Sequence, residues 1–569
     1  MGESYTFYGT VEGTLLRRTM TNPVFEREGL HAVTGCIVPV YPLTAGVGQS
    51  LLHRAIRQGL DEGADRLPDL LPAELRRQHG LCDVRYAYEN IHFPADDAAL
   101  AAARRRLAFE ELYFLTLGLR LLRARRTTVK GKTCAAVDMT PFFGALPFSL
   151  TGAQARAVDD ILRDMTAERP MNRLVQGDVG SGKTVVAAGL CALAAQNGWQ
   201  SAMLAPTEIL ARQHAATLAD RLEPFGVNVT LLVGGMKVKE KRIALEAIAD
   251  GRANLVVGTH AVLTDTVEFK NLGLAIVDEQ HRFGVRQRGL LAGKAQSPHL
   301  LVMSATPIPR TLSLLLCGDL DVSVIDELPA GRKPVKTRLI PAHRREDMYA
   351  YLMRQAQLGV QSYVVCPFID EPEAMDGVSA EGLFAELTEK LPAARVGLLH
   401  GRMSGRRKQA VVEAFRAGQI DILVTTTVIE VGVHVENASI MVIEGADRFG
   451  LAQLHQLRGR VGRGSEQAYC FLLSESGSEA ALNRLSVMVE TNDGFQIAER
   501  DLAQRGPGDL YGTRQHGASS VLDGCDLALL GQAAQAAQVV MALPDAANDA
   551  LLAHVRAGFD ERAFSIAMN

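Results

Sequence analysis

The sequence predicts an α/β protein with two tandem lobes, each built on a parallel β-sheet, and three observations lead to this fold class. Short apolar runs such as NRLVQ, SAMLAP and LAIVDE alternate with helical stretches in the region 149–330. Near-continuous apolar strands are typical of parallel sheets whose two faces are covered by helices. A second set of such runs, among them SYVVCPF, DILVTT and AYCFLLS, follows in the region 331–480. The segment LPAGRKP between the two sets has the Pro and Gly content of a connector.

The remaining regions are assigned from their own patterns. Residues 1–35 contain short alternating stretches, which favour a strand or two. Residues 36–148 carry apolar residues at three- and four-residue spacing, which indicates helices. Residues 481–569 return to a helical pattern around a Gly-rich insert, RGPGDLYGTRQHG. We therefore predict five segments, with the two α/β lobes in the middle of the chain.

Composition narrows the class of protein. The chain has 569 residues, of which 47% are hydrophobic and 22% charged, so it is neither mostly disordered nor collagen-like. The net charge of -4 excludes a basic coat, and any nucleic-acid surface must be local. The eight cysteines are widely scattered, which excludes a compact zinc module or a small disulfide framework. The absence of a long apolar run or a signal-peptide pattern predicts a cytoplasmic protein with no membrane partner.

A candidate phosphate-binding loop follows the strand-like run NRLVQ. The segment GDVGSGKT, from Gly177 to Thr184, fits the pattern G-x-x-x-x-G-K-[ST] and opens a helical stretch. Gly180 and Gly182 let backbone N–H groups curl around an anion at the helix N-terminus. Lys183 is expected to reach the β- and γ-phosphates, and the Thr184 hydroxyl to hold Mg²⁺. The alternative is a Gly-rich turn with an incidental lysine, which the strand and helix on either side disfavour.

Two acidic residues follow the run LAIV. Asp278 and Glu279 come where a parallel strand ends, which is where such sheets place ligand chemistry. One carboxylate can bind Mg²⁺ through water, and the next can act as the general base for the attacking water. Alone, the pair would be as well explained by a solvated loop; together with the phosphate loop it predicts hydrolysis of a nucleoside triphosphate.

Two arginines in the second lobe complete the candidate chemistry. Arg460 and Arg463 lie three residues apart in QLRGRVGR, set among glycines. An arginine that reaches across a cleft to a transferring phosphoryl group can accelerate the reaction by about 10³–10⁵-fold. The alternative is a solvated basic face. If the arginines do cross, hydrolysis depends on closure of the two lobes.

The order of motifs resembles that of superfamily 2 helicases and translocases. The chain reads, in order, LTGAQ, the phosphate loop, APTEILA, VGTH, DEQH, SAT, LLHGRM, TTTVIEVGV and QLRGRVGR. More narrowly, DEQHRFGVRQR, MSATPIPRTL and ERDLAQRGPGDLYGTRQHG resemble the RecG family of ATP-dependent DNA helicases. The resemblance covers nearly the whole chain. It implies two RecA-like P-loop NTPase lobes, an N-terminal helical region and a C-terminal helical hairpin element.

The resemblance also implies residue roles. Gln154 matches the position that recognises adenine, and the residues matching the ATP and Mg²⁺ ligands are Gly177, Gly180, Gly182, Lys183, Thr184, Asp278 and Glu279. Arg460 and Arg463 match arginine fingers. Positions that couple the nucleotide to DNA, or line the DNA path, are matched by His281, Ser304, Thr306, Thr207, Thr259 and Thr425. In the hairpin and its loop, which could also be ordinary packing, the candidates are Arg500, Gln504, Arg505 and Gln515.

The function implied is an ATP- and Mg²⁺-dependent motor on double-stranded DNA. It would remodel branched DNA in recombination and repair, by regressing stalled forks and migrating Holliday junctions. Expected partners are branched or double-stranded DNA, with single-stranded-DNA-binding protein as a further candidate, for a monomer in the bacterial cytoplasm at the nucleoid. Two alternatives stay open: a DNA-binding protein without motor activity, and a transcription-repair-coupling type of translocase without branch specificity.

Two features modify this expectation. Family members begin with a complete oligonucleotide-binding-fold wedge, whereas residues 1–35 resemble only its end and are too short for a five-stranded barrel. We therefore expect a wedge remnant and reduced junction specificity. Residues 101–132 contain nine Lys or Arg against two Glu. This stripe is either a surface for DNA phosphates or a solvated helix face.

Overall fold

The structure is a computed structural model. It describes residues 3–14, 17–28, 34–44, 46–126, 131–135, 138–279, 290–291, 293–295, 297–305, 320–329, 332–367, 379–430, 435, 437–462, 464, 466–476, 478–505, 527–542 and 551–557. The chain divides into two compact units. The described parts of residues 1–121 and 506–561 form the first unit, and those of residues 122–505 belong to the second. None of the described helices is long and apolar enough to cross a membrane.

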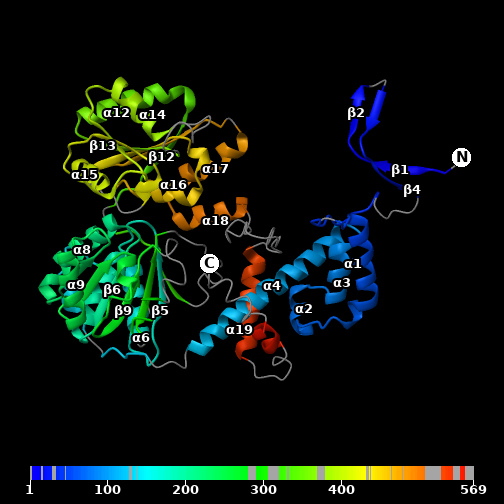
Figure 1. The fold of residues 1–569 in the computed structure, drawn as a ribbon, viewed down its shortest axis with the longest axis horizontal. Helices are drawn as coiled ribbons and strands as arrows, with labels where there is room; N and C mark the ends of the chain where they lie inside the picture. Colours follow the sequence, from blue (N-terminus) through cyan, green and yellow to red (C-terminus); the bar gives the residue numbers. More distant parts are fainter. Residues whose placement is uncertain are drawn as a thin grey trace. The chain divides into compact units, whose positions relative to one another are not determined.

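The first unit begins with short strands and continues as helices. Its strands form two antiparallel pairs, β1 with β4 and β2 with β3: β1 (Tyr5–Tyr8), β2 (Val11–Thr14), β3 (Arg17–Met20) and β4 (Val24–Arg27). Its helices are α1 (Gln49–Gly63), η1 (Ala64–Arg66), α2 (Ala73–His79), α3 (Val84–His92), α4 (Asp97–Arg126) and α19 (Leu527–Ala542). Helix α4 passes beside α19 (Figure 1), and two hydrogen bonds, Arg105 to Gln532 and Arg120 to Gln538, join the two helices.

A buried ion-pair network holds the helices of the first unit together. Arg106 on α4 is fully buried and donates to Asp69 Oδ1 at 2.7 Å, to the carbonyl of Cys82 at 3.0 Å, and to Glu110. Burial raises the pKa of Glu110 even though the Arg106 charge opposes this shift. A guanidinium with its carboxylates this deep in the protein cannot contact a DNA backbone. Part of the basic stripe of residues 101–132 is therefore internal structure.

Replacement of Arg106 by Met should destabilise the first unit by about 3 kcal/mol, because it leaves the largely buried Glu110 carboxylate without its cation. The chain has one tryptophan, Trp199, and it lies in the second unit. Urea unfolding followed by far-UV circular dichroism should therefore show an earlier transition, while the Trp199 fluorescence transition stays in place. Arg104→Met, at an exposed neighbouring position, is the matched control. A shift of both transitions together would contradict this assignment.

The first lobe of the second unit is a seven-stranded parallel sheet in the order β11-β5-β10-β9-β6-β8-β7. Its strands are β5 (Asn172–Gly177), β6 (Gln200–Leu204), β7 (Val229–Leu232), β8 (Leu255–Gly258), β9 (Leu272–Val277), β10 (His299–Ser304) and β11 (Asp321–Ile325). Its helices are α5 (Thr140–Gly144), α6 (Gly152–Met165), α7 (Lys183–Gln196), α8 (Glu208–Leu222), η2 (Glu223–Phe225), α9 (Val238–Asp250) and η3 (His260–Leu263). Apolar side chains of α6, α7 and α8 pack on one face of the sheet, and those of α9 pack on the other.

The second lobe is a six-stranded parallel sheet in the order β12-β17-β16-β13-β15-β14. Its strands are β12 (Lys336–Pro341), β13 (Gln361–Val365), β14 (Val396–Leu399), β15 (Ile422–Thr425), β16 (Ala438–Ile443) and β17 (Tyr469–Ser474). Its helices are η5 (Ala342–Arg344), α12 (Arg345–Gln357), α14 (Ala380–Lys390), α15 (Gly405–Arg416), η6 (Thr427–Glu430), η7 (Ala446–Arg448), α16 (Leu451–Arg458), α17 (Glu479–Glu490) and α18 (Gly494–Arg505). Helices α12 and α14 cover one face, and α15, α16 and α17 cover the other.

The predicted fold class is confirmed: two parallel-sheet lobes lie in tandem, with helices before them and two consecutive helices, α17 and α18, after the second sheet. Every apolar run assigned to a strand is one. Residues 1–35 hold four short strands, β1 to β4, where one or two were predicted. Within the lobes, the strands β11 and β12 were not anticipated. Both lie at sheet edges and carry polar or charged residues, as in DVSVI and KTRLIP, so neither forms a continuous apolar run.

Candidate functional site

The phosphate loop has the strand–loop–helix geometry that its sequence predicts. Strand β5 ends at Gly177, and α7 begins at Lys183. Gly180 and Gly182 have φ angles of 81° and 88°, in the left-handed region where glycine is unstrained. A Cβ at Gly182 would also overlap the Gln154 side chain. The loop therefore needs glycine at these positions for its backbone path and for close packing.

Two residues are held directly against this loop. Lys183 is buried, and its Nζ donates to the carbonyls of Gly177 at 2.7 Å and Asp178 at 2.9 Å. Gln154, near the start of α6, donates from Nε2 to the carbonyl of Ser181 at 2.7 Å and accepts from the backbone of Thr151. The structure thus places Gln154 and Lys183 against the same loop.

The acidic pair lies at the carboxyl end of β9, beside Lys183. Asp278 accepts a 2.8 Å hydrogen bond from His214 Nε2, and its other oxygen accepts from the backbone of Glu279. Burial opposes ionisation of Asp278, but the His214 hydrogen bond and the Lys183 charge hold its pKa below the usual range. Glu279 has a φ angle of 57°, which is strained for a residue with a side chain.

The pKa values of the two neighbouring carboxyl groups, Asp278 and Glu279, are shifted in opposite directions. Burial, and then the charge of Asp278, raise the pKa of Glu279, while the charges of Lys183 and Arg460 oppose this shift. A carboxyl group that stays charged beside one with higher proton affinity is a common arrangement for dividing electrostatic and base roles. Arg460 of the second lobe therefore lies close enough to Glu279 of the first lobe for its charge to act on this carboxyl group.

A hydrogen-bonded chain joins the phosphate loop to the second lobe. Asp178 Oδ1 accepts from His455 Nε2 at 2.5 Å, and His455 Nδ1 accepts from Arg458 at 2.9 Å. Because arginine can only donate, Nδ1 carries no proton and His455 is the neutral Nε2–H tautomer. Arg458 also donates to the carbonyls of Met488 and Thr491, at the end of α17. The chain therefore runs from the phosphate loop to the hairpin helices.

The segment between the lobes also contacts the phosphate loop. Arg332 donates from Nη1 to the carbonyl of Val179 at 2.5 Å, and a Cβ at Gly180 would overlap its guanidinium. On the second lobe, a Cβ at Gly459 would lie 2.7 Å from the Val179 Cβ. Val179 and Gly180 of the phosphate loop thus contact the linker, and Val179 also contacts the second lobe.

The candidate residues of the DNA path lie at the ends of strands and the start of a helix. Thr207 caps α8, accepting a hydrogen bond from the backbone of Leu210. Thr259, Ser304 and Thr425 are buried and lie at or directly after the ends of β8, β10 and β15. The Thr259 hydroxyl has no hydrogen-bond partner within the part of the chain that the structure describes. Of these residues, only Thr207 lines the groove between the lobes.

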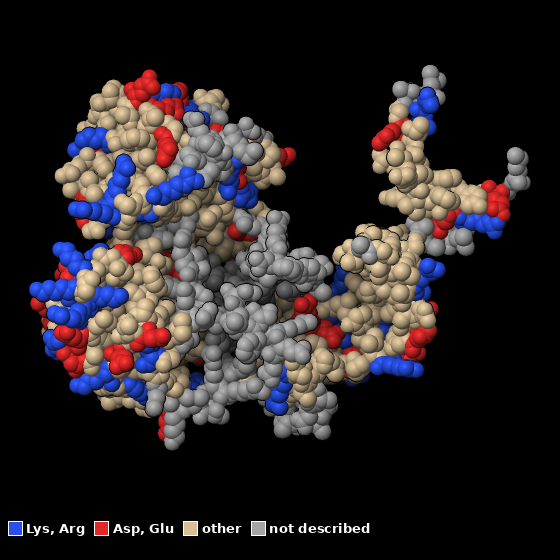
Figure 2. Space-filling view, in the orientation of Figure 1, with Lys and Arg blue, Asp and Glu red and all other residues tan. Residues whose placement is uncertain are grey.

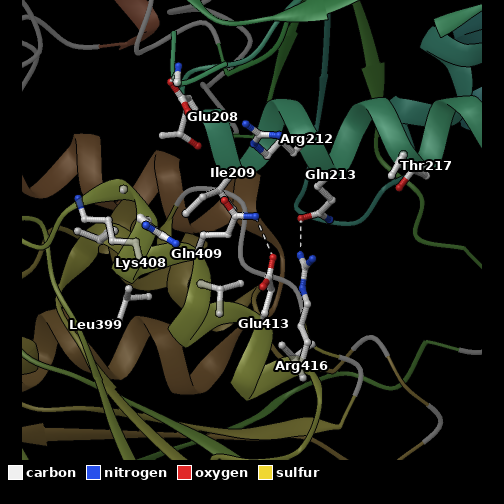
Figure 3. Close-up of a pocket in the computed structure, with 18 of the residues that line it drawn as sticks. Glu208, Ile209, Arg212, Gln213, Thr217, Leu399, Lys408, Gln409, Glu413 and Arg416 are labelled. Atoms are coloured by element: carbon white, nitrogen blue, oxygen red, sulfur yellow. Dashed lines mark hydrogen bonds between the residues drawn. The ribbon is translucent and has the colours of Figure 1, made fainter. Parts of the chain in front are cut away.

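A groove of about 1390 Å³ separates α8 of the first lobe from α15 of the second. Figure 3 shows side chains of the two helices facing each other across it. Its charged lining residues are Arg212, Lys237, Arg406, Lys408, Arg416, Glu208 and Glu413, so cations predominate. A hydrogen bond from Arg416 to Gln213 at 3.1 Å crosses this groove. Figure 2 shows Lys and Arg side chains on both lobes beside the gap between them.

Several candidate residues are not brought to this site or cannot be placed in it. His281, Thr306, Arg463 and Gln515 lie outside the described residues, as does the Arg505 side chain. Arg500 and Gln504 are exposed on α18, which packs against α16, and Arg500 pairs with Glu490 at 2.5 Å. Three residues absent from the sequence-based candidates contact the site: His214, His455 and Arg332. Each is an isolated residue, and no spacing rule marks it.

Family models match the three parts of the chain that the motifs define. Residues 151–315 match the DEAD/DEAH box helicase model, and residues 344–465 match the helicase conserved C-terminal domain. Residues 491–550 match the C-terminal part of domain 3 of the ATP-dependent DNA helicase RecG.

Similar proteins of known name agree with these matches. The ATP-dependent DNA helicase RecG of Synechocystis is 46% identical over 90% of this chain and 62% of its own length. The protein of the same name from Bacillus subtilis is 44% identical over 89% of this chain and 75% of its own length. That of Escherichia coli K12 is 47% identical over 91% of this chain and 77% of its own length. The chain thus spans about three fifths to three quarters of these relatives.

One solved structure covers most of the chain. A structure of RecG bound to a three-way DNA junction is 40% identical in sequence and superposes with a TM-score of 0.72. The match covers 94% of this chain and 70% of the other.

Proposed function

Because the chain belongs to the RecG family of ATP-dependent DNA helicases, we propose that it is an ATP-driven motor on double-stranded DNA that remodels branched DNA. Stalled replication forks and four-way junctions are its proposed substrates, and recombination and repair its setting. One observation supports this proposal above all. The phosphate loop and the acidic pair of the first lobe lie near Arg460 of the second lobe, and the same two lobes border a cationic groove.

The nucleotide proposed for this site is ATP with Mg²⁺. Lys183 would bind the β- and γ-phosphates, and Gln154 would recognise the adenine. The Thr184 hydroxyl and the ionised Asp278 carboxylate are hard oxygen donors of the kind that Mg²⁺ prefers, so they fit a bound magnesium ion. When bound, the ion would neutralise charge on the phosphates. Among the described residues no group of three His, Cys, Asp or Glu side chains lies close enough together to hold a metal ion.

The proposed reaction is in-line hydrolysis of the γ-phosphate. Glu279, whose raised pKa reflects a strong affinity for a proton, would accept the proton of the attacking water. Arg460 would stabilise the charge of the transferring phosphoryl group, together with Arg463. Because Arg460 comes from the second lobe, hydrolysis would require the lobes to be close together.

The DNA is proposed to lie along the groove between α8 and α15. Its cationic lining suits a phosphate backbone. Thr207 would line this path, whereas Thr259 and Thr425 are buried at the ends of β8 and β15 and would support it from behind. His281, Ser304 and Thr306 would relate the path to the nucleotide. In the hairpin and its loop, Arg500, Gln504, Arg505 and Gln515 are proposed to couple lobe closure to movement along the duplex.

We propose a domain division at residues 1–35, 36–148, 149–330, 331–480 and 481–569, corresponding to a wedge segment, a helical region, two motor lobes and the coupling element. The protein is proposed to act as a monomer in the bacterial cytoplasm, at the nucleoid. Single-stranded-DNA-binding protein is a proposed partner.

The deciding experiment compares ATP turnover with linear duplex, a fork and a four-way junction of equal length. A branch-remodelling motor should be stimulated by all three and most strongly by the branched forms. Displacement of a third strand from a triplex should accompany turnover, since a motor strips it and a passive binder leaves it in place. Turnover without strand displacement would contradict the proposed motor activity.

Binding of duplex DNA should become less salt-dependent when groove cations are removed. Arg212→Ala and Arg406→Ala, one on each lobe, should each reduce the slope of log Kobs against log salt by about 1, as for loss of one phosphate contact. Fluorescence anisotropy over a salt series measures the slope. Arg354→Ala, at an exposed position of α12 outside the groove, is the control. Equal slopes for all three variants and the unsubstituted chain would exclude the groove as the DNA path.

A further inference from the structure

Helix α8 has one side that lines the groove and another side that is buried and contacts the acidic pair. Ile209, Arg212, Gln213 and Ala216 recur at three- and four-residue intervals and line the groove. His214, with Leu210 and Leu218, belongs to the buried side. Residues three and four apart share a helix face, whereas positions 212 and 214 lie about 200° apart around the axis. One short rigid element therefore touches both sites.

The buried side of α8 reaches the acidic pair through a single side chain. His214 is 8% exposed, and its Nε2 donates to Asp278 Oδ2 at 2.8 Å. Asp278 Oδ1 accepts from the Glu279 backbone. The carboxylate is thus held from two directions, by its own strand end and by α8. Any displacement of α8 relative to β9 must therefore change the hydrogen bond from His214 to Asp278 or the orientation of the Asp278 carboxylate.

The groove side of α8 reaches the second lobe. Gln213, the residue directly before His214, accepts the hydrogen bond from Arg416 of α15 (Figure 3). Arg212 precedes it and projects into the same groove. A polyanion that engages Arg212 and Arg416 would pull on α8 within 3 Å of axial rise from His214, at about 1.5 Å per residue. Over so short a distance a helix moves as one body.

We propose that His214 is a positioning residue that couples occupancy of the groove by a DNA backbone to the orientation of Asp278 at the nucleotide site. This inference rests on the proposed function. In this arrangement the groove side of α8 senses the DNA, and His214 passes the resulting shift to the carboxylate. A residue that only filled the core would not need a donor aimed at Asp278.

The test compares ATP turnover with and without a saturating linear duplex, and duplex affinity by anisotropy, in single variants. His214→Leu keeps the bulk but removes the donor. It should lower the ratio of stimulated to basal kcat by about 10-fold, the effect of losing a hydrogen bond to a charged group. Its Kd for the duplex should stay within about 2-fold, a small change on a scale where tenfold is 1.4 kcal/mol.

Two further variants separate coupling from packing. His214→Gln places an amide nitrogen at a reach similar to Nε2 and should restore most of the ratio, whereas His214→Asn is too short to do so. His343→Leu, at an exposed position of the second lobe, makes the same change of residue type away from the site and should match the unsubstituted chain. Thermal unfolding of each variant shows whether the fold is retained.

The inference is overturned if His214→Leu lowers the basal and stimulated rates by the same factor, or if Gln and Asn variants behave alike. It is also overturned if duplex affinity falls as much as the rate ratio does. A different result marks failure of the proposed function itself: the unsubstituted chain would show no stimulation by any DNA. The two failures are therefore distinguishable in one set of measurements.

Discussion

Replacement of Lys183 by Ala is expected to lower DNA-stimulated ATP turnover by about 10³-fold, the upper range for loss of one preorganised group that stabilises developing charge. The ammonium group is buried and held over the phosphate loop by the Gly177 and Asp178 carbonyls, so its position is fixed before nucleotide binds. Steady-state turnover with saturating duplex measures the effect.

The control for this variant removes an equivalent charge elsewhere. Lys333→Ala, at an exposed position of the linker, should turn over ATP at the rate of the unsubstituted chain. Duplex binding by the Lys183→Ala variant should persist, because Lys183 does not line the groove. DNA-stimulated turnover retained in the Lys183→Ala variant would remove the phosphate loop from the proposed site.

Replacement of Arg460 by Ala should lower kcat by at least about 10³-fold, as expected for an arginine that acts on the transferring phosphoryl group. The affinity for nucleotide should change far less, because such an arginine acts mainly in the transition state. Arg460 is buried, and its charge opposes the rise in the pKa of Glu279. Single-turnover kinetics with a fluorescent ATP analogue separates binding from hydrolysis.

Arg354→Ala serves again as the control, since Arg354 is exposed on α12 of the same lobe. Arg460→Lys should recover little activity, because a lysine cannot reproduce the planar, two-pronged contact of a guanidinium with phosphate oxygens. An Arg460→Ala variant with normal kcat and weakened nucleotide binding would assign Arg460 to ground-state binding instead.

The parts of the site that sequence could predict are contiguous in the chain. Gly177 to Thr184 form one loop, and Asp278 and Glu279 adjoin at one strand end, so a short pattern encodes their geometry. The parallel sheets were equally accessible, since buried strands are continuous apolar runs. The edge strands β11 and β12 were not, because half-exposed strands lack that signal.

The contacts that sequence could not predict join residues far apart in the chain. His214 lies 64 residues from Asp278, and His455 lies 277 residues from Asp178. Which histidine meets which carboxylate depends on how helices pack on the finished sheets. The charge count of residues 101–132 left the role of this stretch open for a related reason: it cannot tell the buried, ion-paired Arg106 from its exposed neighbour Arg104.

The segment 326–335 connects β11 of the first lobe to β12 of the second. A connection this short keeps the two lobes at an effective concentration, relative to each other, on the order of millimolar. If Arg460 acts as proposed, its encounter with the phosphates is intramolecular. Turnover per molecule should then be independent of dilution. A separately added second lobe would need millimolar concentrations to replace the tethered one.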